Sequence, residues 1–282
     1  MSANIIDGKA LAAKIKAELK LKIIDLTLKG RQPGLAVVIV GDNPSSRKYV
    51  NMKKKACAEL GIYSQEHALT GEATQAELIR LIDNLNQDPK IHGILVQLPL
   101  PGQLNEAQII ERISPSKDVD GFHPINVGKL LIGIPGFISC TPAGVMELIK
   151  ATEVSIIGKE CVVVGRSNIV GKPQAMLLLR EHGTVTVCHS KTSDLEVICR
   201  RADILVVAAG KPELIRGDMV KAGAVVIDVG TSVNAAGKLV GDVHFDSVAE
   251  VAGWLTPVPG GVGPMTIAML MKNTVESAWG ML

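Results

Sequence analysis

The strongest constraint on the fold is an alternation along the chain between short apolar runs and longer stretches with helical periodicity. The runs are rich in Val and Ile: LAVVIVG (35–41), HGILVQL (92–98), CVVVG (161–165), VTVCHS (185–190), ADILVVAAG (202–210) and AVVIDVG (224–230). Continuous apolar runs of this length suit strands that are buried on both faces. Strands that alternate with helices predict parallel sheets, so we expect an α/β fold.

The apolar runs fall into two groups, separated by a region of 100–158 that is rich in Pro, Gly and Ser. Thr141 and Pro142 can begin a helix there, which places a domain division near residue 140. We predict two α/β domains with a cleft between them, an N-terminal substrate-binding catalytic domain at 1–140 and a Rossmann-type dinucleotide-binding domain at 141–263. Residues 264–282 predict a last helix; its periodicity does not decide which domain it joins, and we expect it to pack back on the first.

Composition argues against several classes of protein. The 282 residues are 47% apolar and 21% charged, which is enough apolar material for packed cores. A net charge of +2 without a basic stripe argues against nucleic-acid binding. There is no run of 18 apolar residues and no secretion signal at the start, so we expect no membrane association. Five cysteines without a C-x-x-C pair and six scattered histidines predict no metal site and a reducing, cytoplasmic location.

A strand, a tight turn and a helix follow one another in ECVVVGRSNIVGKPQAMLLLREHG (160–183). Gly165 ends the strand and lets the backbone approach a pyrophosphate, and Gly171 opens a helix whose free N–H groups favour anions. Five residues separate the two glycines, which differs from the usual G-x-G-x-x-G. Many strand–helix turns contain glycine for geometric reasons alone, so this turn by itself leaves both interpretations open.

The end of the next strand indicates which dinucleotide is bound. An NAD site usually has Asp or Glu there for the ribose 2′-hydroxyl. This chain instead has HSKT at 189–192, and Arg166 follows the first glycine. Arg166, Ser190 and Lys191 suit a 2′-phosphate, which a carboxylate would repel. The alternative is that the two cations are merely exposed; we predict NADP.

Groups that can move protons occur in the N-terminal half. SSRKYVNMKKKACAELG (45–61) reads as an amphipathic helix in which Tyr49 and Lys53 share a face, while Lys54 and Lys55 project away from it. A lysine beside a tyrosine hydroxyl can exchange protons with a substrate. An ordinary surface lysine is the alternative that this helix alone leaves open.

Two further polar residues lie where open α/β sheets place ligands. Gln97 precedes the prolines of VQLPLP, which cannot extend a central ladder, so it stands at the carboxyl end of a strand. Asp120 in KDVDGFHP can accept hydrogen bonds from a ligand, although Asp-Gly is also a common turn. TPVPGGVGPMT (256–266) is either a linker or a stiff loop whose glycines permit close backbone approach.

Taken in order, these segments resemble one family. SSRKYVNMKKK, VQLPLP, KDVDGF, CTPAGVMELI, VVVGRSNIVGKP, HSKT, ADILVVAAGKP, VIDVGT and TPVPGGVGPMT together are similar to the bifunctional methylenetetrahydrofolate dehydrogenase/cyclohydrolases, and the resemblance spans essentially the whole chain. It implies a cytoplasmic homodimer that acts on tetrahydrofolate derivatives in one-carbon metabolism and purine biosynthesis. With NADP, such enzymes oxidise 5,10-methylenetetrahydrofolate to the 5,10-methenyl form, and then hydrolyse that to 10-formyltetrahydrofolate.

The resemblance also assigns residues. It implies a catalytic group of Lys53, Tyr49, Gln97 and Asp120, with Asp120 binding the pterin. Further folate contacts are implied at Val96, Leu98, Pro259, Gly260, Gly261, Val262 and Gly263. NADP contacts are implied at Gly165, Arg166, Ser167, Gly171, Ser190, Lys191 and Thr231.

Two positions depart from the family pattern. Thr231 stands where a more apolar residue is common, and His244 where an acid is common; the first departure affects an implied cofactor contact, and neither affects the implied catalytic group. Two alternatives remain: a shikimate- or amino-acid-type NADP dehydrogenase with the same two-domain plan, and a non-catalytic NADP-sensing module. The first leaves Tyr49, Lys53 and PGGVGP unexplained, and an intact Lys53, Gln97 and Asp120 argue against the second.

Overall fold

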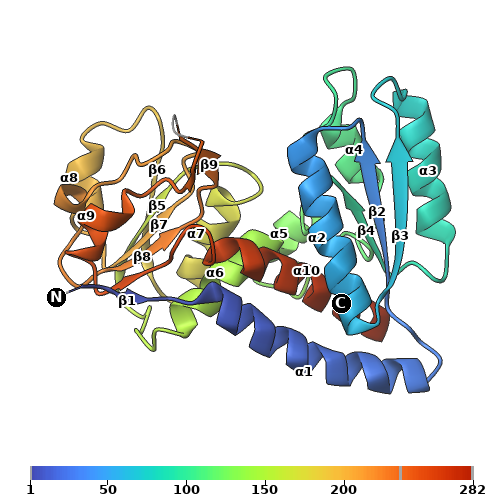
Figure 1. The fold of residues 1–282 in the computed structure, drawn as a ribbon, viewed down its shortest axis with the longest axis horizontal. Coiled ribbons are helices and arrows are strands. Elements are labelled where there is room, and N and C mark those ends of the chain that lie inside the picture. Colours follow the sequence, from blue (N-terminus) through green and yellow to red (C-terminus); the bar gives the residue numbers. More distant parts are fainter. Residues whose placement is uncertain (1, 235–236, 281–282) are drawn as a thin grey trace. The chain divides into compact units, whose positions relative to one another are not determined.

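The computed structural model describes residues 2–234 and 237–280, and the chain in it divides into two compact units. The six-stranded unit comprises residues 2–13 and 141–266 apart from 235–236; the three-stranded unit comprises 14–140 and 267–280. The chain passes between the units within helices α1 (Gly8–Leu28) and α10 (Val262–Trp279), and after residue 140 (Figure 1). The last two residues of the predicted helix 264–282 lie outside the described residues.

The six-stranded unit contains a parallel sheet with the order β1-β11-β8-β7-β5-β6. Its strands are β1 (Asn4–Ile5), β5 (Glu160–Val164), β6 (Thr184–Cys188), β7 (Ile204–Val207), β8 (Val225–Asp228) and β11 (Trp254–Leu255). Its helices are α6 (Cys140–Lys150), α7 (Gly171–Arg180), α8 (Leu195–Cys199), α9 (Phe245–Ala249) and a 3₁₀ turn at Gly217–Met219. β9 (Ser232–Val233) and β10 (Leu239–Val240) form a small antiparallel pair.

The order of these strands indicates at which edge of the sheet a ligand is expected. The chain leaves β5 for β6 on one side and then crosses to β7 on the other, so β5 lies between them. Ligands of doubly wound sheets bind where the order reverses in this way, outside the carboxyl ends of the strands. The apolar runs predicted from sequence supply the buried strands; β7 and β8 are buried at every position.

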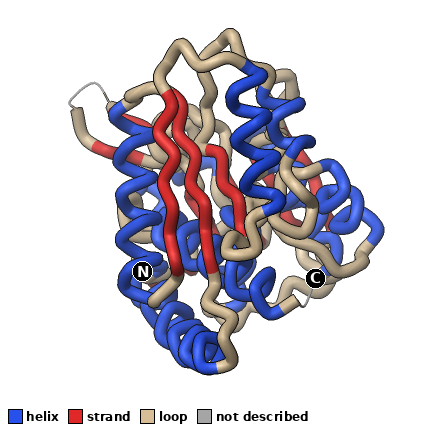
Figure 2. The backbone as a smooth tube through the Cα atoms, turned by 90° about the vertical axis from the view of Figure 1, so that its right-hand side faces the viewer, coloured by secondary structure: helices blue, strands red, loops and turns tan. Residues whose placement is uncertain are grey.

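The three-stranded unit repeats this plan on a smaller scale. Its parallel sheet has the order β3-β2-β4, with β2 (Gly34–Val40), β3 (Tyr63–Leu69) and β4 (Gly93–Val96), and Figure 2 shows these strands side by side. Its remaining helices are α2 (Pro44–Leu60), α3 (Gln75–Gln87), α4 (Glu106–Arg112) and α5 (Pro124–Ile132). All seven residues of β2 are buried, and the order again reverses at this strand. The predicted α/β fold with parallel sheets is confirmed.

Local sequence fixes the ends of the helix that follows β2. The side chain of Asn43 accepts hydrogen bonds from the backbone N–H groups of Ser45 and Ser46, and Pro44 occupies the first turn. Gly61 ends the helix in the left-handed conformation at φ 81°. α2 therefore begins and ends at defined residues, which fixes the register of the side chains that it carries.

The C-terminal part of α10 is attached to the three-stranded unit by buried polar contacts. Nδ2 of Asn273 donates to the carbonyl oxygens of Val119 and Ile138, at 2.8 and 3.0 Å. The hydroxyl of Ser277 donates to the carbonyl of His92 at 2.6 Å. Because Val119 precedes Asp120, the Asn273 side chain also supports the turn that carries this acid.

We expect replacement of Asn273 by Ala to lower the free energy of unfolding by about 1–3 kcal/mol, since the Ile138 carbonyl loses the Asn273 donor and the Val119 carbonyl keeps only the weaker Cys140 thiol. Urea unfolding measures the change. Lys272→Ala, at the neighbouring position of α10, serves as the control and should stay within about 0.5 kcal/mol of the parent protein. An Asn273→Ala variant as stable as the Lys272→Ala variant would contradict this role.

Candidate functional site

Lys53 and Gln97 meet at the carboxyl edge of the three-stranded sheet. Nζ of Lys53, on α2, donates to Oε1 of Gln97 at 3.0 Å. The Gln97 backbone N–H continues the ladder to Val38 O at 2.8 Å, and its Nε2 donates to Leu98 O at 2.8 Å. The amide is therefore oriented by the chain itself, with its oxygen directed at the ammonium. Gln97 stands where the strand order reverses, as predicted for a residue at a strand end.

The register of α2 separates Lys53 from the lysines beside it. Lys53 is 9% exposed and lies on the buried face of the helix. Lys54 is exposed and donates to Glu66 Oε2 at 2.6 Å, and together with Arg47 it holds the pKa of Glu66 below its usual range. Lys55 is also exposed. Burying an ammonium is costly unless it has partners, so the position of Lys53 is unlike that of an ordinary surface lysine.

Asp120 lies near Lys53 in the turn that follows β4. The side chain is half-buried, and desolvation raises the pKa of its carboxyl to about 6, against the opposing effect of the Lys53 charge and with a further rise from Asp118. Gly121 follows with φ 73°, and a Cβ there would meet the Ile138–Ser139 peptide at 2.5 Å. Perturbed carboxyl groups of this kind are frequent at functional sites.

Two residues that support this turn were not singled out from the sequence as supports. Asp118 is 2% exposed and accepts from the backbone N–H groups of Phe122 and His123 and from Nδ2 of Asn126. The buried Cys140 thiol donates to Val119 O at 3.3 Å, and desolvation followed by the Asp120 charge raises its pKa. The acidic turn was visible in KDVDG, but its partners lie too far along the chain for sequence spacing to identify.

Tyr49, one turn before Lys53 on α2, is 36% exposed. The three-stranded unit thus brings together an ammonium, a neutral amide and a carboxyl group, with a phenol close by in sequence. These groups can orient a polar heterocycle and transfer a proton. Among residues 2–234 and 237–280 there is no cluster of His, Cys, Asp or Glu that could hold a metal ion.

The turn between β5 and α7 requires both of its glycines. Gly165 has φ 134°, and a Cβ there would lie 2.2 Å from the carbonyl oxygen of Ala208 at the end of β7. A Cβ on Gly171 would lie 2.2 Å from Gly165 O. Oγ of Ser167 accepts from the N–H groups of Val170 and Gly171, which orders the start of the helix. The backbone therefore packs closely at the point where the strand order reverses, and this is the geometry that a phosphate-binding turn needs.

The predicted 2′-phosphate residues are exposed. Arg166, Ser190 and Lys191 all have open side chains, and HSKT follows β6 with no acid among its residues. The loop is shaped locally: Nδ1 of His189 accepts from Lys191 N at 3.1 Å, and the Thr192 hydroxyl accepts from His189 N at 2.8 Å. The arrangement leaves cationic and hydroxyl groups free for an anionic ligand.

The two departures from the family pattern have different settings. Thr231 is exposed and lies two residues beyond Val229, the first residue after β8. His244 caps α9: its Nδ1 lies 2.9 Å from Ser247 Oγ and accepts from Ser247 N at 3.4 Å. The His244 imidazole can therefore cap α9 at a position where an acid is common in the family.

The PGGVGP loop belongs to the six-stranded unit as far as residue 266. Gly261 has no room for a side chain because a Cβ would meet Pro257 O at 2.7 Å and Thr256 Cβ at 2.8 Å. Its own carbonyl lies 2.0 Å from where a Cβ of Gly8 would be. Packing inside the unit therefore demands glycine here, which is a different reason from the ligand approach expected from the sequence. Gly263 does face open space.

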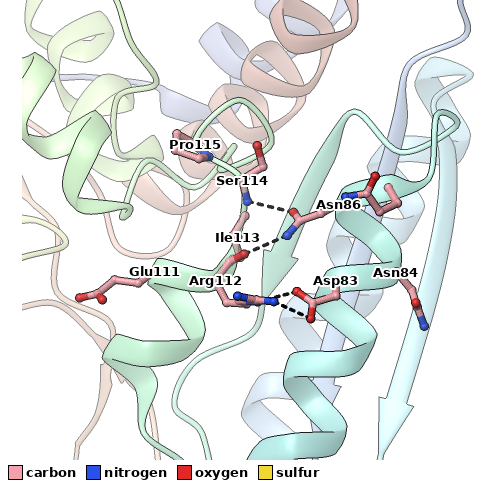
Figure 3. Close-up of a pocket in the computed structure, with 9 residues that line it drawn as sticks. Asp83, Asn84, Asn86, Glu111, Arg112, Ile113, Ser114 and Pro115 are labelled. Carbon is pink, nitrogen blue, oxygen red and sulfur yellow. Dashed lines mark hydrogen bonds and ion pairs between the residues drawn. The ribbon is translucent and has the colours of Figure 1, made fainter.

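A hollow of about 550 Å³ lies elsewhere, between α3 and α4 (Figure 3). Arg112 forms a two-pronged ion pair with Asp83, and the Asn86 amide bonds to Arg112 O and Ser114 N. None of the predicted site residues lines it. The predicted cleft between the domains stays a prediction.

Two family models match the chain. Residues 6–120 match the catalytic domain of tetrahydrofolate dehydrogenase/cyclohydrolase, and residues 139–281 match the NAD(P)-binding domain of the same family. The Bifunctional protein FolD of Acetivibrio thermocellus is 64% identical over 278 residues, 99% of this chain and 98% of that protein. That of Moorella thermoacetica is 60% identical over 278 residues and 99% of each chain.

Solved structures show a similarity to the same family. A bifunctional FolD methylenetetrahydrofolate dehydrogenase/cyclohydrolase from Campylobacter jejuni has a TM-score of 0.98 at 55% identity, covering 100% of both chains. A FolD from Trypanosoma brucei in complex with NADP and an inhibitor has a TM-score of 0.95 at 43% identity, covering 100% of this chain and 99% of that one. A shikimate dehydrogenase from Thermus thermophilus shares only the fold, at 16% identity, 88% of this chain, 100% of that one and a TM-score of 0.54. This chain belongs to the tetrahydrofolate dehydrogenase/cyclohydrolase family.

Proposed function

We infer that the chain catalyses two consecutive reactions: the NADP-dependent oxidation of 5,10-methylenetetrahydrofolate to 5,10-methenyltetrahydrofolate, and its hydrolysis to 10-formyltetrahydrofolate. The observation that carries this is the match of both halves of the chain to the family. The hydrogen bond between Lys53 and Gln97 supports it, because it places an ammonium group and its partner beside Asp120. The shikimate-type alternative has only a distant likeness of fold behind it.

The first reaction demands alignment more than proton transfer. A hydride leaves the carbon that bridges two folate nitrogens, and the cation that remains is delocalised over both. The nicotinamide of NADP supplies the acceptor for this hydride. No proton has to move, so the protein contributes mainly by holding the two molecules in register. We propose that the Gly165–Gly171 turn holds the pyrophosphate and that Arg166, Ser190 and Lys191 hold the 2′-phosphate.

The second reaction demands proton transfer. Water adds to the methenyl carbon and its oxygen loses both protons as the formyl C=O forms; a ring nitrogen gains one of them as its bond to that carbon breaks, the other is released, and the formyl group stays on the other nitrogen. We propose that Lys53 relays these protons. Gln97 orients it through the 3.0 Å hydrogen bond, and its amide does not titrate. Tyr49, on the same helix, is proposed to border the substrate.

Asp120 is proposed to bind the pterin ring. Its pKa of about 6 leaves it mostly ionised near neutral pH, so it can accept hydrogen bonds from the N–H groups of the ring. The neighbours of Gln97, Val96 and Leu98, and the backbone of the loop at 259–263 are proposed as further folate contacts.

We also propose a cytoplasmic homodimer. All five cysteines are free and buried, which suits a reducing compartment. In the described part of the chain no helix is long and apolar enough to cross a membrane.

Replacing Lys53 by Met tests the division of labour between the two reactions. Met keeps an unbranched side chain but removes the charge and the proton, so methenyltetrahydrofolate hydrolysis should fall about 10²–10⁴-fold. NADPH formation should fall less, because it depends on alignment. Methenyl absorbance, followed as it accumulates and as it decays, measures both steps in one sample.

Lys55→Met is the matched control, since Lys55 is exposed and lies outside the Lys53–Gln97 pair. Lys54→Met is a poorer control because it also removes the ion pair between Lys54 and Glu66. If Lys53→Met hydrolyses the methenyl compound as fast as the parent protein, or if Lys55→Met is the damaging change, the proposed role of Lys53 is wrong.

The preference for NADP is tested by replacing Arg166 and Ser190 together by Ala. The change should narrow the preference for NADP over NAD by about 1–3 kcal/mol, the scale of charge-assisted hydrogen bonds. The ratio of kcat/KM for the two nucleotides measures this. Equal use of both nucleotides by the parent protein would contradict the proposed 2′-phosphate site.

A further inference from the structure

Two buried carboxylates lie together at the carboxyl edge of the six-stranded sheet, and the reactions proposed above do not use them. Asp228 is the last residue of β8 and is 3% exposed; Asp242 follows β10 and is 0% exposed. Neither forms an ion pair with a cation in the described chain. The two groups are neighbours, since the backbone N–H of Asp242 donates to Oδ1 of Asp228 at 2.9 Å.

Asp228 uses both of its oxygens to bind backbone. Oδ1 accepts from Gly230 N as well as from Asp242 N, each at 2.9 Å, and Oδ2 accepts from Val243 N at 3.0 Å. Its own backbone N–H donates to the hydroxyl of Thr256 at 2.7 Å, where the PGGVGP loop begins. The Asp228 carboxylate therefore connects the residues that follow β8 to the segment 242–243 by hydrogen bonds.

Asp242 continues the network to the exit of β7. Its Oδ2 accepts from Ala209 N at 2.7 Å and from Gly210 N at 2.8 Å, while its Oδ1 is buried and meets no donor of the described chain. Ala208, immediately before these two residues, is the one whose carbonyl crowds Gly165. The network thus ends at the reversal point between β5 and β7.

The burial of this pair has a cost. Desolvation raises the pKa of Asp228 to about 6 and raises that of Asp242, so burial disfavours the charged form of both groups. Two glycines must also leave room: a Cβ on Gly241 would lie 1.8 Å from Asp228 Oδ2, and one on Gly230 would lie 2.4 Å from the Asp242 carboxyl. Costly arrangements of this kind are retained mostly at functional sites.

We propose that Asp242, supported by Asp228, is a positioning residue of the nucleotide site. It fixes the backbone that leaves β7, beside the Gly165–Gly171 turn, so that a dinucleotide meets groups already in place. Preorganised backbone contributes to affinity because less order has to be created on binding. The proposal rests on the proposed use of NADP, and it concerns affinity for the nucleotide; neither carboxylate is assigned a chemical step.

Replacing Asp by Asn is expected to weaken NADP binding at position 228 but not at position 242. Asp242→Asn can keep its two hydrogen bonds through the amide oxygen and place its NH₂ group where Oδ1 has no donor, so the dissociation constant for NADP should stay within about twofold of the parent value. Asp228→Asn must turn an NH₂ group toward a backbone N–H whichever way it faces. It should bind NADP about tenfold more weakly, and so should Asp242→Ala.

Asp203→Asn is the control at another carboxylate that holds a backbone N–H, although Asp203 also pairs with Lys221 at 2.7 Å. Oδ2 of Asp203 accepts from Glu160 N at 3.0 Å, but at the opposite, amino edge of the same sheet, before β7. It should leave NADP affinity unchanged. Methenyltetrahydrofolate hydrolysis without nucleotide should stay within about twofold in all variants, since a positioning role in the nucleotide site does not touch the folate residues. Titration calorimetry measures the NADP affinities.

The outcomes are separable. NADP affinity of Asp228→Asn or Asp242→Ala equal to that of the parent overturns the proposal, and so does an equal loss in Asp203→Asn, which indicates general loosening of the unit. Should Asp242→Ala fail to fold, the NADP affinities of Asp228→Asn and Asp242→Asn are compared instead; equal affinities overturn the proposal. A parent protein that binds no NADP overturns the proposed function, and this proposal with it.

Discussion

The hydrogen bond between Lys53 and Gln97 is the interaction on which the proposed folate chemistry depends. An ammonium that is 9% exposed needs a partner, and the neutral amide of Gln97 provides one. Both ends of the bond are set by secondary structure. The Asn43 cap and Gly61 fix the register of α2, and Gln97 extends the ladder of β4 to Val38.

Each unit applies the same topological rule separately. In each sheet the first strand of a βαβ unit, β5 or β2, lies between the two strands that follow it in the chain, and the groups assigned to ligands follow the carboxyl ends of that strand and a neighbour. In the three-stranded unit these groups are side chains: an ammonium, an amide and a carboxyl. In the six-stranded unit they include the backbone of the Gly165–Gly171 turn, where close packing demands both glycines, and the residues after β7, whose main-chain N–H groups Asp242 holds.

The sequence predicted what depends on local pattern. The apolar run at 35–41 became β2 at Gly34–Val40, and helical spacing separated Lys53 from Lys54 and Lys55. It did not identify partners that are distant in the chain. Asp242 binds backbone 33 and 32 residues away, and Gly8 packs on Gly261; neither contact leaves a periodic trace. For the same reason the sequence suggested ligand approach at Gly261, where internal packing already demands glycine.

The central claim is that one chain performs a hydride transfer that needs alignment and a hydrolysis that needs proton movement. Isotope effects on the two steps of the parent protein test this most directly. Deuterium at the bridging carbon should slow NADPH formation without a comparable effect on methenyltetrahydrofolate hydrolysis, and deuterated water should slow the hydrolysis while leaving NADPH formation nearly unchanged. A solvent effect of equal size on both steps, or none on the hydrolysis, would contradict the account.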